Sequence, residues 1–146
     1  MKYIKYSSGK LCYDIRIDRK FTIIKGNSST GKTTLCSVVS TELNNPTGAL
    51  ETNCNCMVLN NMTWRALVHD NYNASIVFLA DEDFSDAPSV EFSRRALKSK
   101  HYFILITRAD LENIPYSVNS IYELHYSGKY TTLRRLYDDS TDNNLR

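Results

Sequence analysis

The residues from Phe21 to Leu35, FTIIKGNSSTGKTTL, constrain the fold of this 146-residue chain more than any other stretch. The first part, FTIIK, is short, partly β-branched and apolar at its centre, which is typical of a strand buried on both faces of a sheet. After it, two glycines enclose small polar residues, and from Thr33 to Leu43 apolar residues recur at roughly helical spacing. The sequence therefore predicts a buried strand, a tight loop and a helix in direct succession.

The loop between these two elements has the composition of a phosphate-binding loop. Residues 26–33 match the pattern G-x-x-x-x-G-K-[ST]. Glycines let the backbone approach an anion closely, and the N–H groups of such a loop act on phosphate together with the positive end of the helix dipole. The residues expected to bind the phosphates are Gly26, Asn27, Ser28, Ser29, Thr30, Gly31, Lys32, Thr33 and Thr34. The alternative is a glycine-rich turn that caps a helix and binds nothing.

Further short apolar runs recur along the chain, separated by segments that can be helical. The apolar runs are Cys56–Leu59, Ile76–Ala80, Phe103–Thr107 and Ile121–Leu124, and the candidate helices are Trp64–His69 and Val90–Ser99. Strands that alternate with helices predict an α/β fold whose parallel sheet is covered by helices. Two alternating segments, which turn at Ser8–Gly9 and Ser127–Gly128, predict antiparallel β-hairpins.

Polar residues stand where two of these predicted parallel strands end. Asp81 and Glu82 directly follow one apolar run, and Thr107 ends another. Ligands of open α/β sheets bind at the edge where the carboxyl ends of the strands meet. The alternative for each of these residues is a local role, because carboxylates and threonines also commonly cap the next turn.

These stretches resemble the motifs of P-loop NTPases. GNSSTGKT resembles the Walker A motif, SIVFLADED resembles the Walker B motif, and Thr107 resembles the sensor-type polar residue of the strand between them. The resemblance implies a three-layer α/β sandwich, with a central, mostly parallel sheet that the antiparallel hairpins extend. It also implies a catalytic role for Lys32 at the β- and γ-phosphates, for Glu82 on the attacking water and for Thr107 on that water or the γ-phosphate. Thr33 and Asp81 would hold Mg²⁺.

The order of the motifs resembles one branch of this superfamily, the branch with an additional central strand and a catalytic glutamate. An extra strand and helix separate the two Walker motifs, and Glu82 directly follows Asp81. That likeness implies that the strand Phe103–Thr107 lies between the two Walker strands. The N-terminal hairpin looks like the core of ABC-type ATPases, which implies that Tyr3, Tyr6 or Tyr13 stacks on adenine. HDNYNA stands where the LSGGQ signature of transporters would be, so a transporter-type dimer is not expected.

Two other enzyme classes and one non-enzyme class remain open. TRAD, residues 107–110, is similar to the guanine-reading [NT]-K-x-D motif of GTPases, although Arg108 replaces the lysine and Phe84 stands where that class has glycine. DEDF, residues 81–84, resembles a motif of one thymidine kinase type, without the zinc-binding cysteine quartet. The non-enzyme alternative is a nucleotide-dependent interaction module with negligible hydrolysis.

Composition limits the possible partners of the protein and its cellular location. A formal charge of +2 gives no clear indication of a nucleic-acid partner, and no apolar run is long enough for a membrane span. Cys12, Cys36, Cys54 and Cys56 lack the spacing of a zinc site and are expected to be free thiols in the cytoplasm. We expect one nucleotide-binding domain over residues 1–137 and a polar tail or linker over 138–146. The predicted function is binding of Mg-ATP and its hydrolysis to ADP and phosphate, which drives or gates the interaction with a protein partner or a second copy.

Overall fold

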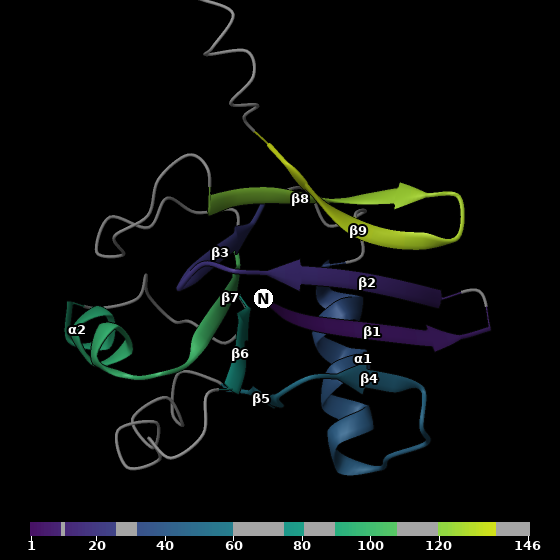
Figure 1. The fold of residues 1–146 in the computed structure, drawn as a ribbon, viewed down its shortest axis with the longest axis horizontal. Helices are drawn as coiled ribbons and strands as arrows, with labels where there is room; N and C mark the ends of the chain where they lie inside the picture. Colours follow the sequence, from purple (N-terminus) through teal and green to yellow (C-terminus); the bar gives the residue numbers. More distant parts are fainter. Residues whose placement is uncertain (10, 26–31, 60–74, 81–89, 108–119, 137–146) are drawn as a thin grey trace, which may run out of the picture.

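The fold was analysed in a computed structural model that describes residues 1–9, 11–25, 32–59, 75–80, 90–107 and 120–136 (Figure 1). Of Lys32, Thr33 and Thr34 it describes the backbone alone. The strands are β1 (Lys2–Ser8), β2 (Leu11–Ile17), β3 (Phe21–Ile24), β4 (Leu50–Thr52), β5 (Asn55–Val58), β6 (Ser75–Ala80), β7 (Tyr102–Ile106), β8 (Ile121–Ser127) and β9 (Tyr130–Arg135). The helices are α1 (Lys32–Asn44) and α2 (Val90–Lys98).

All nine strands form one mixed sheet in the order β4-β1-β2-β9-β8-β3-β7-β6-β5. The strands β8, β3, β7, β6 and β5 run parallel to one another. The pairs β1–β2 and β8–β9 are antiparallel, so both predicted hairpins are confirmed. A parallel pairing of β2 with β9 joins the two hairpins. Gly9 and Gly128 lie in the hairpin turns with positive φ angles, a conformation that glycine adopts without steric cost.

The predicted three-layer α/β sandwich is wrong. In the part of the chain that the structure describes, 53% of residues are in strands and 23% in two helices, and the sheet is mixed, barrel-like and nearly closed. The hairpins do not extend a flat central sheet; they continue it through β2 and β9 and curl it around α1. The reason is that alternating hairpin strands need cover on one face only, whereas buried parallel strands need it on both. The predicted helix Trp64–His69 lies outside the described residues.

The concave face of the sheet packs on α1. Leu35, Cys36 and Val39 of the helix share one buried cluster with inward-facing residues of six strands. These strand residues are Ile4, Tyr13, Ile15, Ile17, Ile24, Ile76, Phe78, Ile104, Ile106 and Leu124. The two hairpins therefore bury their alternate side chains on the same helix that follows the glycine-rich loop.

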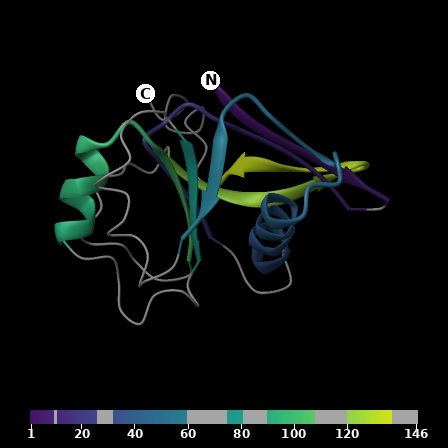
Figure 2. The same cartoon turned by 90° about the horizontal axis from the view of Figure 1, so that it is seen from below.

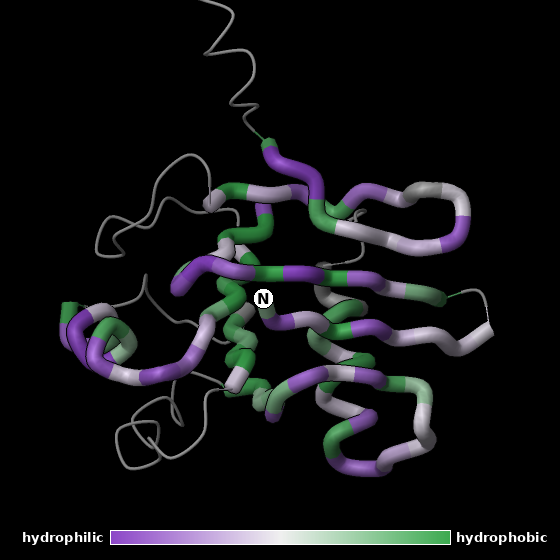
Figure 3. Tube along the Cα trace, in the orientation of Figure 1, coloured by the Kyte–Doolittle hydropathy of each residue, from purple (hydrophilic) through white to green (hydrophobic). Residues whose placement is uncertain are grey.

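The opposite face of the parallel strands packs on α2. Phe92 and Ala96 of the helix share a second buried cluster with residues of β3, β6 and β7. Phe103 is stacked on Phe21 at 5.6 Å between ring centroids and meets Phe92 edge to face at 5.7 Å. Figure 2 shows α1 and α2 on either side of β6 and β7. In Figure 3 these two strands are almost continuously hydrophobic, while β2 alternates. This is the difference between covered and half-covered strands.

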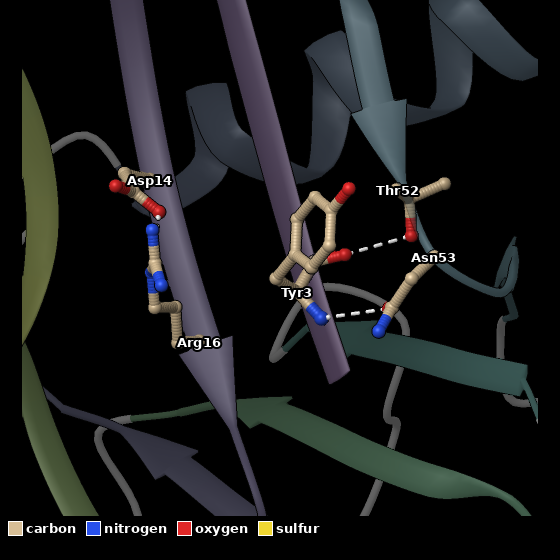
Figure 4. A network of polar contacts seen from close by, with 5 residues as sticks. All are labelled: Tyr3, Asp14, Arg16, Thr52 and Asn53. Atoms are coloured by element: carbon tan, nitrogen blue, oxygen red, sulfur yellow. Dashed lines mark hydrogen bonds and ion pairs between the residues drawn. The ribbon is translucent and has the colours of Figure 1, made fainter. Parts of the chain in front are cut away.

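The two outer strands of the sheet, β4 and β5, are consecutive in the chain, and their connection is tied to β1 (Figure 4). The backbone N–H of Tyr3 donates to Oδ1 of Asn53 at 3.0 Å, and the Thr52 hydroxyl donates to the carbonyl oxygen of Tyr3 at 2.7 Å. The amide of Asn53 donates to the Met1 carbonyl oxygen at 2.9 Å. These bonds hold the point where the curved sheet comes closest to closing on itself.

Candidate functional site

Three neighbouring parallel strands end level with one another. The pairing register aligns Ile24 of β3 with Ile106 of β7, and Ile106 with Ala80 of β6. The prediction that β7 lies between the two strands that carry the glycine-rich loop and the acidic pair is therefore confirmed. Because the strands are parallel, Lys25 and Thr107 follow β3 and β7 at the same edge of the sheet, and Asp81, the next residue of the chain after β6, lies outside the described residues.

The helix α1 is the next element of the chain after β3. Only residues 25–31 connect the end of β3 with Lys32, the first residue of the helix. The first turn of α1 carries no acidic residue, so no carboxylate of that turn competes for its N–H groups. Four N–H groups at a helix start have no partner within the helix and attract anions. The helix start therefore follows the end of β3 after seven residues, in the strand–loop–helix order that the sequence predicts.

The end of β3 is fixed from both sides. The backbone N–H of Thr107 donates to the carbonyl oxygen of Ile24 at 3.1 Å, and the N–H of Lys25 donates to that of Tyr122 in β8 at 2.9 Å. Thr107 is 1% exposed, which places a hydroxyl-bearing residue inside the edge where β7 ends. Buried polar groups are as a rule hydrogen-bonded, so the environment of Thr107 holds this residue in a defined position at the edge.

The other predicted site residues fall partly outside the described part of the chain. Gly26, Asn27, Ser28, Ser29, Thr30, Gly31, Asp81 and Glu82 lie outside it, and only the backbone is described for Lys32, Thr33 and Thr34. Within the described residues, no group of three or more His, Cys, Asp or Glu side chains is placed to hold a metal ion. For Mg²⁺ the chemistry of the predicted donors fits, because a threonine hydroxyl and a carboxylate are the hard oxygen ligands that this ion prefers.

The tyrosines of the first hairpin separate onto two faces. The register and the burial pattern put Tyr3 on the outer face, with Lys5, and Tyr6 and Tyr13 on the concave face, with Ile4 and Ile15. Tyr13 is only 2% exposed, and its ring centroid lies 6.5 Å from that of Tyr6. Burial, followed by the neighbouring Tyr6, raises the pKa of the Tyr13 phenol, so this group stays neutral. Tyr13 is therefore core, with no open face for a ligand.

Sequence reasoning missed Tyr126 on β8. Leu124, two residues before Tyr126, belongs to the concave core. Tyr126 therefore faces the same side, yet 65% of it is exposed. The available signal was the alternation of the segment ELHYS, in which Leu124 and Tyr126 share a face. The sequence did not show its exposure, because exposure depends on how far the core covers the concave face at this hairpin.

None of the four cysteines forms a disulfide bond, as predicted. Cys54 and Cys56 both approach the Thr52 hydroxyl, with S···O distances of 3.9 and 3.7 Å. Burial raises the pKa of the Cys56 thiol to about 11, so this side chain is a thiol at neutral pH. Since the thiolate is the form that reacts, Cys56 is not an activated nucleophile.

Comparison of the chain with protein-family models, with curated proteins and with solved structures finds no significant match. Neither helix of the described part of the chain is long and apolar enough to cross a membrane. The interpretation of the site therefore depends on the residues and on their arrangement.

Proposed function

We propose that this protein binds Mg-ATP where β3, β7 and β6 end, and that it hydrolyses ATP to ADP and phosphate. One observation supports this most directly. The register aligns Ile24, Ile106 and Ala80, so the glycine-rich loop, Thr107 and the Asp81–Glu82 pair follow three adjacent strands at one edge. The loop, Thr107 and the acidic pair are each predicted to lie at the ligand-binding edge, and each for a separate chemical reason.

Different residues of the chain have different roles in the proposed reaction. The N–H groups of residues 26–31 and of the first turn of α1 hold the phosphate oxygens, and Lys32 contributes a cation at the β- and γ-phosphates. Thr33 and Asp81 would hold Mg²⁺, which would neutralise negative charge on those phosphates. Glu82 accepts a proton from the attacking water, whose oxygen bonds to the γ-phosphorus as the bond from that phosphorus to the ADP oxygen breaks. Thr107 orients the water or the γ-phosphate.

Hydrolysis under this proposal is coupled to a partner, either another protein or a second copy of the chain. Many domains of this kind hydrolyse slowly until a further cation is supplied in trans. A reducing cytoplasm is the proposed location and agrees with the absence of a disulfide bond among the four cysteines.

Lys32→Ala tests the binding site. The substitution removes a charge-assisted contact with the phosphates, so Mg-ATP affinity should fall by about 2 to 3 kcal/mol, roughly 30- to 150-fold. Isothermal titration calorimetry measures the change. Lys98→Ala, which removes the same charge from the exposed last turn of α2, is the control and should bind as the wild type does. Unchanged affinity in the Lys32 variant would show that the phosphates bind elsewhere.

Glu82→Gln separates an enzyme from a binding module. The amide cannot take the proton of the attacking water, so phosphate release should drop at least about 100-fold while the dissociation constant for Mg-ATP stays the same. Asp83→Asn, one residue further on, is the control for loss of charge. If the wild type and the Glu82→Gln variant both bind ATP but release no phosphate, the protein is a binding module. Titration with GTP, and a search for phosphate on added nucleosides, decide the GTPase and kinase alternatives.

A further inference from the structure

Two thiols lie on the same face of the chain where β4 leads into β5. Cys54 and Cys56 both pack against the buried cluster around α1, whereas Met57, the next residue, packs against the cluster on the opposite face of the sheet. Both cysteines are half-buried. Each therefore keeps some contact with solvent, through which a small ion can reach it in the folded protein.

The two sulfurs gather around one oxygen. Sγ of Cys54 lies 3.9 Å from Oγ1 of Thr52, and Sγ of Cys56 lies 3.7 Å from the same atom. The Cys56 side chain also turns back along the chain, because its sulfur lies 3.9 Å from the carbonyl oxygen of Cys54. The two thiols are therefore close neighbours within a single turn.

The turn that carries the thiols is fixed at both ends. The Thr52 hydroxyl donates to the carbonyl oxygen of Tyr3, and its oxygen accepts the backbone N–H of Cys54 at 3.3 Å. The side chain of Asn53 bonds to the backbone of the first residues of the chain. After the turn, Cys56 lies in β5, which pairs with β6. Ligands held in this way lose little conformational entropy when they bind an ion.

A pair of sulfur donors favours one class of metal ion. Within the residues that the structure describes, no group of three or more His, Cys, Asp or Glu side chains is placed to hold a metal. Zn²⁺ takes four ligands in structural sites, so two thiolates leave half of its coordination shell open. Cu⁺ is a soft ion that prefers thiolate ligands, and two thiolates on opposite sides of it complete a linear shell. The pair therefore fits a soft monovalent ion.

We propose that Cys54 and Cys56 bind one Cu⁺ ion between their sulfurs. Each thiol releases its proton to the solvent, two Cu–S bonds form and the copper stays as Cu⁺, so no oxidant or reductant takes part. The site lies where β5 begins, and the register places Asn55 opposite Ser75, the first residue of the parallel strand β6. It is thus at the edge where these strands start, whereas the ATP site is proposed where parallel strands end. The inference does not depend on the proposed function.

The experiment measures how much Cu⁺ the reduced full chain takes from a coloured Cu⁺ chelator in the absence of oxygen. The wild type should take up one ion per chain, and X-ray absorption at the copper edge should show sulfur neighbours only. Cys54→Ser and Cys56→Ser should each weaken Cu⁺ binding at least about 100-fold, because losing a ligand costs more than losing an outer-shell partner. An equal concentration of Zn²⁺ should not displace the copper.

Cys12→Ser is the matched control. Cys12 is a buried thiol of β2, and its sulfur lies 3.5 Å from the Ser7 hydroxyl. Its loss should leave Cu⁺ affinity unchanged. In the wild type, bound Cu⁺ should protect Cys54 and Cys56 from alkylation by iodoacetamide, which mass spectrometry reads residue by residue without any substitution. The inference is overturned if the wild type takes no copper from the chelator, if both single variants bind it as tightly as the wild type does, or if copper protects neither cysteine.

Discussion

At the scale of single residues, His101 shows how one buried polar side chain fixes the start of two strands. It is 0% exposed, and its Nδ1 accepts the backbone N–H of Ser75, the first residue of β6, at 3.1 Å. The backbone N–H of His101 donates to the Ser99 hydroxyl at 3.3 Å. The His101 ring meets the Phe103 ring edge to face, at 6.4 Å between centroids. The Ser99 hydroxyl also accepts a hydrogen bond from Nζ of Lys20. The same Nζ lies 5.9 Å from the centroid of the Phe103 ring.

We predict that His101→Phe destabilises the protein. The phenyl ring fills similar space but cannot accept the Ser75 N–H, and a buried donor without a partner costs about 1 to 3 kcal/mol. Urea denaturation followed by circular dichroism measures the loss. His101→Asn offers an acceptor oxygen near the position of Nδ1 and serves as the comparison. A Phe variant as stable as the wild type would show that this bond is dispensable.

At the scale of elements, the connection from α1 to β4 is held by a carboxylate. Glu42, in the last turn of α1, accepts hydrogen bonds from the hydroxyl of Thr47 and from its backbone N–H, the latter at 3.1 Å. The hydroxyl contact first, and the N–H second, lower the pKa of Glu42 below its ordinary value of 4.5. The connection then continues into β4, which pairs with β1. The contact therefore helps to place one outer strand of the sheet.

The lowered pKa of Glu42 makes this connection sensitive to acid. The unfolded chain takes up the proton first as pH falls, so the stabilisation is complete above about pH 4.5 and is lost as pH falls through the lower pKa of the folded state. Glu42→Gln should therefore melt at a lower temperature than the wild type at pH 7, and the gap should narrow towards pH 3. A gap that does not change between pH 7 and pH 3 would contradict this role of Glu42.

At the scale of the whole molecule, local patterns predicted some features and not others. The strand β3, the helix after the glycine-rich loop and both hairpins follow from apolar spacing and turn residues within each segment. The pairing of β2 with β9 joins segments more than a hundred residues apart, and an alternating pattern shows which face is buried but not which strand lies alongside. For that reason the curvature of the sheet, and with it the exposure of Tyr126, had to come from the structure.

The near-closure of the sheet also bears on how the folded molecule behaves in a crowded solution. Unpaired strand flanks are templates on which other chains assemble, and proteins limit this hazard by keeping such flanks short or covered. Here the two flanking strands are β4 and β5, which contain three and four residues. Within the described residues, the two edge strands of this sheet thus present only short lengths of unpaired backbone to other molecules, which limits fibrous aggregation at those edges.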